Sequence, residues 1–451
     1  LNDVQSGAMG EAWSDYYAAD YRTYKGFEPN TSKDVEILEG KYLTGGTAIR
    51  TEAMDCTDGT TSANCPAGGY TYGDLPTIGG TPEVHASGEV WAQTLWDIHE
   101  KLGRTKADTL ITRAMELSPD DPSMLDERNA ILQADQIAYN GNNSASLWKV
   151  FANRGMGYFA GTVDGGDTQP AEDFHIPPAA GAPSGDLSGT VKDANTNAPL
   201  ANAVVRITGH DSGYIGSFTA VSDANGHYSI SNVPAGAYQK VVASAPGYEV
   251  AVAPVTIASG GTTKDWAIRQ DFAASSGGGE ITHFDGPDYS PDCGPTFAID
   301  LSEGTGWGST TGNDAGDPAS AVIPKAITIK LSQPIDISSG GSTTAFAVDP
   351  TATCGDPGSS STGEYKIEVS TDNVSWTTAV DGSGANAFTA ANRYAYTNVA
   401  SSVSVSGVKY VRFTMLSPQV PDFSTNCPDG AYGGCQFMDM SELEVFGTPA
   451  P

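Results

Sequence analysis

The stretch GAMGEAWSD, residues 7–15, decides the fold of the first part of the chain. Its two acids, Glu11 and Asp15, are four residues apart and therefore share one face of a helix. Burying two carboxylates beside Met9 and Trp13 costs free energy unless a cation or a proton donor neutralises them. A metal ligand at Glu11, with Asp15 orienting another ligand, would meet that requirement. A solvated acidic helix face is the alternative, and by spacing alone it is the commoner arrangement.

The next informative stretch is PEVHASGEVWA at residues 82–92, which places His85 at the entrance of an amphipathic helix. An imidazole in an acidic cleft could donate a hydrogen bond to a developing oxyanion. A helix cap or an exposed surface residue is the alternative role. Arg50 stands apart, because it is the last cation before Lys101. It could face carboxylates or a substrate carbonyl, or it could make a surface ion pair.

Helical periodicity extends through the first 160 residues. Apolar residues on one face predict a helix over residues 84–103, and these are Trp91, Leu95, Ile98 and Leu102. Cap and stop signals predict further helices over residues 105–117, 121–140 and 144–155. Residues 21–82 lack such periodicity, and long irregular segments of this kind are often binding surfaces.

From residue 187 onward, the pattern changes to short alternating strands. Residues 161–186 are rich in Gly, Pro, Asp and Ala and predict a linker, and three glycines mark a second linker over residues 273–280. Residues 187–272 and 281–449 therefore predict two all-β domains, for which a sandwich is the expected packing. The predicted strands include residues 203–207, 227–230, 326–331, 365–369, 410–415 and 442–446.

The chain of 451 residues has a formal net charge of −31 at pH 7. Such a surplus of acid argues against binding nucleic acid, because the phosphate backbone requires clustered cations. It argues equally against binding anionic membrane surfaces. No run of about 18 apolar residues occurs, so we expect no membrane span. Length and composition together predict an acidic globular protein of several domains.

The cysteines indicate an oxidising compartment. An even number at loop-like positions predicts three disulfides and a secreted, extracellular protein. Sequential pairing is the expected connectivity, which joins Cys56 to Cys65, Cys293 to Cys354 and Cys427 to Cys435. The chain starts at Leu1 without a signal segment, so we expect a processing site or a fragment boundary there.

Together and in this order, the motifs resemble those of the fungalysin-type zinc metallopeptidases, which are relatives of thermolysin. The family hallmark GMGEGWSD is present as AMGEAWSD at residues 8–15, and the family's Ile-Arg element is present at residues 49–50. The PEVH and GEVWA elements are intact within residues 82–92, and the closing RxAILQAD and WxxFAxRGxG patterns occupy residues 128–135 and 148–157. The resemblance identifies residues 1–160 as the C-terminal part of the catalytic domain, a mainly α-helical lobe.

The resemblance also implies roles for four residues. Glu11 would be the third protein ligand of a catalytic zinc ion, and Asp15 would orient a zinc-bound histidine from outside this chain. His85 would stabilise the oxyanion, and Arg50 would hold a substrate backbone carbonyl. In such enzymes zinc lowers the pKa of its bound water and polarises the scissile carbonyl, while a glutamate removes the proton of that water.

The chain departs from the family in one decisive respect. No His-Glu-x-x-His motif occurs among its six histidines, which are His85, His99, His175, His210, His227 and His283. The resemblance therefore implies an N-terminal segment that carries this helix as a partner. The chain alone should be inactive, because a catalytic zinc ion takes three protein ligands. The acid that orients His85 also stays open, since the nearest acids are Glu83 and the more distant Asp74.

The two β-regions carry resemblances of their own. Residues 187–270 resemble the carboxypeptidase-regulatory-like domain, a transthyretin-like sandwich, through DANGHY at 223–228 and PAGAY at 234–238. Residues 280–449 resemble a discoidin-like jelly roll, through AID at 298–300, Trp307 and YKIEVSTD at 365–372. Such jelly rolls often bind glycans or cell surfaces, and some hold a structural calcium ion. A passive stabilising role is the equal alternative.

We therefore expect a secreted zinc endopeptidase that hydrolyses protein or peptide substrates by zinc-activated water, followed by two accessory β-sandwiches. The alternative is a non-catalytic cell-surface or glycan-binding protein that has kept a degenerate peptidase half. The coding sequence before Leu1 discriminates between them, because a His-Glu-x-x-His motif there would support the enzyme.

Overall fold

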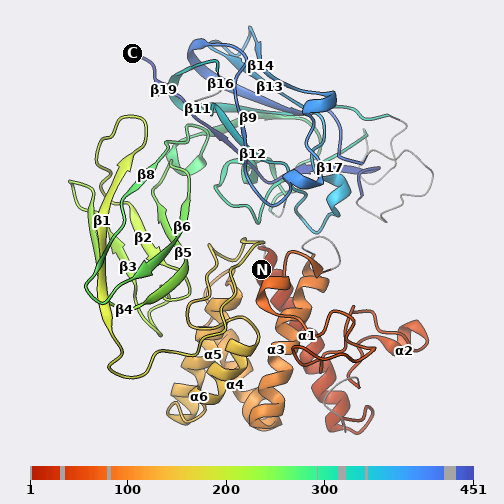
Figure 1. The fold of residues 1–451 in the computed structure, drawn as a ribbon. Coiled ribbons are helices and arrows are strands. Elements are labelled where there is room, and N and C mark those ends of the chain that lie inside the picture. The colour runs from red at the N-terminus through yellow and green to blue at the C-terminus, as the bar shows by residue number, and fades with distance from the viewer. Residues whose placement is uncertain are drawn as a thin grey trace.

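The computed structural model describes residues 3–30, 36–78, 83–291, 293–312, 321–340, 344–420 and 433–451. A helical part is followed by two parts built from β-sheets, as expected from the sequence (Figure 1). The helices are α1 (Val4–Tyr24), α2 (Lys41–Thr44), α3 (Val84–Leu102), α4 (Arg104–Leu117), α5 (Met124–Tyr139) and α6 (Ser144–Asn153). The helices predicted from periodicity are confirmed as α3 to α6.

Helix α3 shows how the local sequence sets the bounds of an element. It begins where the Glu83 carboxylate accepts hydrogen bonds from the backbone N–H groups of His85 and Ala86, and it ends at Gly103, whose φ is 80°. The apolar face predicted for it is buried, since Trp91, Leu95 and Ile98 are fully covered. Its hydrophobic stripe therefore anchors the helical part.

Helices α1 and α3 pack closely against each other, and Gly88 permits this approach. A Cβ atom at Gly88 would lie 2.6 Å from the carbonyl oxygen of Ala8 and 3.5 Å from the Cβ atom of Glu11. No other residue type has room there. The close packing brings the start of α3 beside the middle of α1.

The first β-part consists of two four-stranded sheets. In one sheet β1 pairs with β4 in antiparallel fashion and with β7 and β8 in parallel fashion, and the other sheet has the order β3-β2-β5-β6. The strands are β1 (Ser184–Asp193), β2 (Val204–Ile207), β3 (Thr219–Val221), β4 (His227–Pro234), β5 (Gly236–Ser244), β6 (Ala251–Ile257), β7 (Thr262–Thr263) and β8 (Trp266–Ile268).

The last β-part has a six-stranded sheet, in which β14-β13-β16-β11-β19 are neighbours and β9 pairs with β11. A three-stranded sheet β15-β12-β18 and the pair β10-β17 complete it. The strands are β9 (Glu280–Phe284), β10 (Trp307–Thr310), β11 (Lys325–Ile337), β12 (Phe346–Asp349), β13 (Tyr365–Ser370), β14 (Thr377–Gly382), β15 (Thr397–Val399), β16 (Val405–Met415), β17 (Phe437–Met440), β18 (Glu442–Val445) and β19 (Thr448–Pro449). The strands predicted for both β-regions lie within or overlap these elements.

One hydrophobic core extends from the helical part into the first β-part. Leu125 of α5 and Tyr158 after α6 belong to the same buried cluster as Ile207 and Tyr238 of the first β-part. His210 lies at this junction, fully buried, with its Nε2 atom 2.6 Å from the carbonyl oxygen of Tyr158. Burial lowers the pKa of His210 to about 3, so the imidazole is neutral at ordinary pH.

The segment between these two parts contains no helix, but it is firmly attached. The amide and carbonyl groups of Gly161 and Ala171 bond each other in both directions. The carboxylate of Asp167 accepts hydrogen bonds from the backbone N–H of Val163 and from Lys240 of β5, the latter at 2.5 Å. Asp167 is buried, and such a pair ties the segment to the sandwich.

Two of the predicted disulfides are present. Cys56 is joined to Cys65 and Cys293 to Cys354, which confirms sequential pairing for these four residues. Cys435 is also disulfide-bonded, while its predicted partner Cys427 lies outside the described residues.

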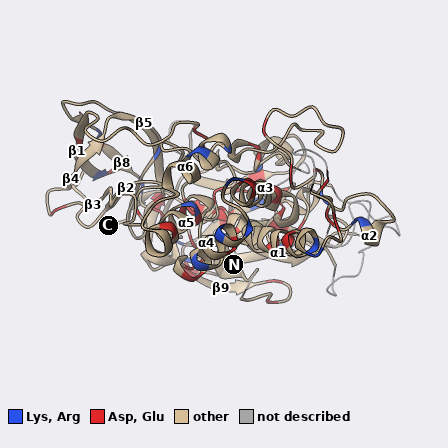
Figure 2. Cartoon of the chain, turned by 90° about the horizontal axis from the view of Figure 1, so that it is seen from below, with Lys and Arg blue, Asp and Glu red and all other residues tan. Residues whose placement is uncertain are grey.

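The acidic residues are distributed over all parts of the molecule (Figure 2). No acidic tail accounts for the net charge of −31. In the portion of the chain that the structure describes, no helix is both long and apolar enough to cross a membrane.

One buried acid of the core predicts a pH-dependent stability. Glu127 of α5 is fully buried, and the hydroxyl of Ser118 only partly offsets the effect of that burial on its carboxyl group. Burial raises the pKa of Glu127 to about 7, so the folded protein retains this proton up to that pH. The unfolded chain releases it near its ordinary pKa of 4.5, so stability falls as the pH rises from 4.5 towards 7.

We therefore expect Glu127→Gln to raise the free energy of unfolding at pH 8 by up to about 3 kcal/mol and to have little effect at pH 4. Urea unfolding at both pH values, followed by tryptophan fluorescence, measures the difference. An equal effect of the substitution at both pH values would contradict the assignment.

Candidate functional site

Helix α1 presents Glu11 and Asp15 on one face, as the spacing predicted. Arg50 lies against both of them. Its Nε atom is 2.7 Å from one Asp15 oxygen, and its Nη2 atom is 3.1 Å from the other. The same Nη2 atom is 3.4 Å from Oε2 of Glu11. Burial alone would lower the pKa of Arg50, but the hydrogen bond and the charge of Asp15 raise it above its ordinary value.

His85 reaches the same place from the start of α3. Its Nε2 atom lies 3.3 Å from Oε2 of Glu11, while its Nδ1 atom contacts the carboxylate of Glu83. Burial opposes ionisation of Glu83, but its hydrogen bonds with the side chain of His85 and with the backbone N–H groups of Ala86 and His85 lower its pKa. An ionised Glu83 favours a proton on Nδ1 of His85.

The structure thus distinguishes the two acids that the sequence left open. Glu83 contacts the imidazole of His85, whereas Asp74 accepts a hydrogen bond from the backbone N–H of Thr71 at 2.8 Å. Of the four residues singled out from the sequence, Arg50 and His85 contact Glu11 directly. Asp15 contacts Arg50 and is thereby connected to the same place.

Glu89 is a further residue of this region, to which sequence reasoning assigned no role. It lies on α3, and its carboxylate accepts hydrogen bonds from the backbone N–H groups of Thr51 and Glu52 at 2.8 and 2.9 Å. Burial raises the pKa of Glu89 to about 7 against the opposing effect of these bonds. The available signal was a glutamate next to Val90 and Trp91, in the apolar part of the helix.

The donor set at Glu11 fits one carboxylate ligand of a zinc ion. The Glu11 side chain is 37% exposed, so its oxygens are accessible to a further partner, while Asp15 and Arg50 beside it are largely covered. Zinc sites use carboxylate oxygens in this way together with histidine nitrogens. Helix α1 would therefore contribute one zinc ligand, the carboxylate of Glu11.

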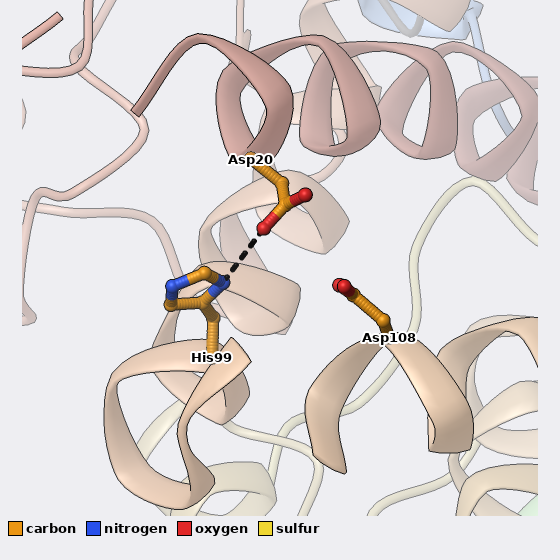
Figure 3. A group of neighbouring side chains, drawn as sticks. All are labelled: Asp20, His99 and Asp108. Carbon is orange, nitrogen blue, oxygen red and sulfur yellow. Dashed lines mark ion pairs between the residues drawn. The ribbon is translucent and has the colours of Figure 1, made fainter. Parts of the chain in front are cut away.

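A second cluster is the one group of three potential metal ligands found in the described part of the chain. Asp20, His99 and Asp108 point toward one another from α1, α3 and α4 (Figure 3). Both oxygens of Asp20 are bonded by Arg104, at 2.7 and 2.6 Å, and Asp108 accepts from the hydroxyl of Tyr16 at 3.0 Å. Because the arginine and the tyrosine already satisfy the carboxylates, we assign this cluster to the stability of the helical part.

The last β-part contains a different group of acids. Glu442 of β18 is fully buried, and its Oε2 atom accepts from the backbone N–H groups of Asp300 and Leu301 at 3.0 Å each. Its Oε1 atom has no hydrogen-bond partner among the described residues. Burial and the neighbouring charge of Asp300 raise the pKa of Glu442 well above its ordinary value. An unpartnered buried carboxylate oxygen beside a second carboxyl group suits a hard cation such as calcium.

Comparisons with known proteins find similarity in the part of the chain that contains Glu11, Arg50 and His85. Residues 1–160 match the family model described as fungalysin metallopeptidase (M36), and residues 186–268 match the carboxypeptidase regulatory-like domain. Extracellular metalloproteinase 2 of Arthroderma gypseum is 33% identical in an alignment 181 residues long that covers 35% of this chain and 26% of the relative. Extracellular metalloproteinase 3 of Trichophyton tonsurans is 31% identical over 182 residues. The chain spans about a quarter of the length of the curated relatives it matches.

Solved structures similar to part of the chain include carbohydrate-binding modules. One is CBM32-3 from a family 31 glycoside hydrolase of Clostridium perfringens, with 22% identity and a TM-score of 0.26, covering 38% of this chain and 90% of that chain. Another is the family 32 module of Streptococcus pneumoniae EndoD, with 14% identity and a TM-score of 0.25, covering 40% of this chain and 99% of that chain.

The motifs around Glu11, Arg50 and His85 therefore lie within a region that matches a known family. Residues 1–160 are similar to the fungalysin metallopeptidases (M36), and residues 186–268 are similar to the carboxypeptidase regulatory-like domain.

Proposed function

We propose that the chain is the C-terminal lobe of a secreted zinc metalloendopeptidase with two accessory β-domains. The observation that carries this proposal is the meeting of Arg50 and His85 at Glu11, inside the region that matches the peptidase family. Glu11 would hold zinc together with two histidines of a His-Glu-x-x-His segment outside this chain. The bound ion would polarise the scissile carbonyl and lower the pKa of its water.

The chain's own residues have separable tasks in this proposal. His85, as an imidazolium with protons on both ring nitrogens, would donate a hydrogen bond from Nε2–H to the carbonyl oxygen of the substrate as that oxygen gains negative charge. Glu83 would hold the imidazole in place through Nδ1. Arg50, whose guanidinium Asp15 holds on one side, would bind a backbone carbonyl of the peptide and so align it.

The finer features of the fold and the location belong to the same proposal. We propose a transthyretin-like sandwich for residues 187–272 and a discoidin-like jelly roll for residues 281–449. The relatives are named extracellular metalloproteinases, which supports secretion of this chain as well. Two described disulfides agree with an oxidising compartment.

The test compares this chain with the product of the whole natural gene. Zinc content by mass spectrometry and hydrolysis of casein are measured for both, with a chelator and with zinc added back. We expect zinc and chelator-sensitive hydrolysis in the whole product and neither in this chain alone. Hydrolysis by this chain alone would overturn the need for the absent segment. A folded whole product without zinc or hydrolysis would overturn the peptidase and favour the binding protein.

We also propose a calcium ion in the last β-part, held by Glu442 and Asp300. A ligand that binds only the folded state stabilises it by about 2.7 kcal/mol at a concentration 100-fold above its Kd. For a domain of this size, each kcal/mol shifts the Tm by roughly 2–4 °C. Calcium should therefore raise the Tm of the last β-part by roughly 5–10 °C.

The Glu442→Gln variant should lose this calcium-dependent shift in scanning calorimetry. Glu368→Gln is the matched control, because Glu368 is a buried glutamate of the same domain whose carboxylate already accepts hydrogen bonds from Arg412 at 2.9 and 2.7 Å. An unchanged calcium response of Glu442→Gln would refute the assignment.

A further inference from the structure

The segment that carries Arg50 has little regular structure of its own. Residues 45–53 follow the single turn of α2 and form turns and bends without a strand. The guanidinium of Arg50 is fixed at its far end by Asp15, but a side chain can be placed only as well as its backbone. The position of Arg50 therefore also depends on the contacts of its own backbone.

Glu89 supplies that support. One carboxylate oxygen accepts from the backbone N–H of Thr51 at 2.8 Å, and the other accepts from the backbone N–H of Glu52 at 2.9 Å. The hydroxyl of Thr51 lies 3.0 Å from both oxygens and 2.7 Å from the hydroxyl of Tyr70. Glu89 is only 4% exposed, so water does not compete strongly for these bonds.

The position of Glu89 on α3 gives these bonds a further meaning. Glu89 is one helical turn after His85, and α3 packs on α1 through Gly88 with no room for a side chain. The same helix therefore fixes His85 directly and the backbone beside Arg50 through Glu89. Arg50 and His85 approach Glu11 from two segments of the chain. The carboxylate of Glu89 joins these segments and so fixes the distance between them.

We propose that Glu89 is a positioning residue, which sets the place of Arg50 relative to His85 and Glu11 by clamping the two backbone N–H groups that follow Arg50. This inference rests on the proposed peptidase function for its catalytic meaning. It concerns residues that touch one another in this chain, so it has a readout that requires no activity.

The first experiment uses this chain labelled with ¹⁵N-arginine. The Nε–H signal of Arg50 is identified by its absence in Arg50→Lys, and its exchange with solvent is slow because it donates to Asp15. In Glu89→Gln the side-chain amide replaces one acceptor by a donor, so at least one of the two backbone N–H groups loses its partner. We expect the exchange of Arg50 Nε–H to accelerate at least about tenfold.

Glu127→Gln is the matched control, because Glu127 is equally buried but lies on α5, where its neighbours are Ser118 and Asp126. It should leave the Arg50 signal unchanged. If Glu89→Gln does not fold, Glu89→Asp keeps the charge but shortens the reach, and it should show the same acceleration. An Arg50 signal that exchanges as slowly in these variants as in the unchanged chain would overturn the proposal.

The second experiment uses the whole natural product. Glu89→Gln should raise the KM for a peptide about tenfold, with kcat changed by less than about threefold, because a displaced Arg50 loses a hydrogen bond to the substrate backbone that is equally strong in the ground state and the transition state. A loss confined to thermal stability, with both kinetic constants unchanged, would show a merely structural glutamate. If the whole product hydrolyses nothing, the proposed function fails, while the exchange experiment still decides whether Glu89 positions Arg50.

Discussion

Replacing Glu11 by glutamine should lower peptide hydrolysis by the whole natural product roughly 10²–10³-fold. Glutamine keeps the shape of the side chain, but it removes the negative charge that a zinc ion needs from this position. It also leaves Arg50 and His85 with a weaker partner, since both now contact Oε2 of Glu11. Zinc content, measured after dialysis against a weak chelator, should fall together with activity.

A surface glutamate serves as the control for this substitution. Glu116 lies on α4 with its side chain 58% exposed, and its partner is Arg113 on the same helix. Glu116→Gln should leave both zinc content and hydrolysis unchanged. Full zinc occupancy and full activity in Glu11→Gln would rule out Glu11 as a ligand and would remove the central residue of the proposed site.

The second large effect concerns stability. Arg128 of α5 is fully buried and donates hydrogen bonds to the carbonyl oxygens of Met156, Gly157 and Gly209, at 3.1, 2.8 and 2.8 Å. Its guanidinium also lies 5.0 Å from the ring centre of Trp148. Burial lowers the pKa of Arg128 to about 10, so the group keeps its charge at neutral pH. The bond to Gly209 connects the helical part to the first β-part.

Arg128→Met should therefore destabilise the protein by about 3–5 kcal/mol, because it removes several buried hydrogen bonds of a charged group, and only the Gly157 and Gly209 carbonyls keep weaker donors in Ala160 and Asn129. Methionine fills much of the same volume, so the loss reports the hydrogen bonds more than a cavity. Urea unfolding followed by circular dichroism measures the change. Arg113→Met, at an exposed arginine of α4, is the control and should change stability by less than about 0.5 kcal/mol. A similarly small effect of Arg128→Met would mean that packing alone joins the two parts.

Much of the helical part could be predicted because its signals are local. The stripe of Trp91, Leu95 and Ile98 predicts both the existence of α3 and its buried face, and Gly103 predicts its end. The shared face of Glu11 and Asp15 follows from their spacing in the same way. The strands could be predicted for a similar reason, since alternation and turn residues lie within a few positions of each other.

Features that depend on distant partners could not be predicted from the residues alone. Glu83 and Asp74 are both acids near His85, and only the way the chain turns before α3 decides which one reaches the ring. Arg128 belongs to a visible motif, but its acceptor on Gly209 is 81 residues away. Residues 161–186 have the composition of a linker, although Asp167 in this segment is buried against Lys240. The composition of a segment indicates how flexible that segment would be on its own. It does not reveal contacts with distant residues such as Lys240.

The core shared by the helical part and the first β-part has a consequence for engineering and for evolution. A domain that is joined only by a flexible linker can be removed or exchanged for another domain without changing the fold of the rest of the chain. Here the first β-part contributes Ile207 and Tyr238 to the core that it shares with the helical part. The carbonyl oxygen of Gly209 also accepts a hydrogen bond from the buried Arg128. Replacing this β-part alone would expose the core that it shares with the helical part. We therefore expect the two parts to be retained together.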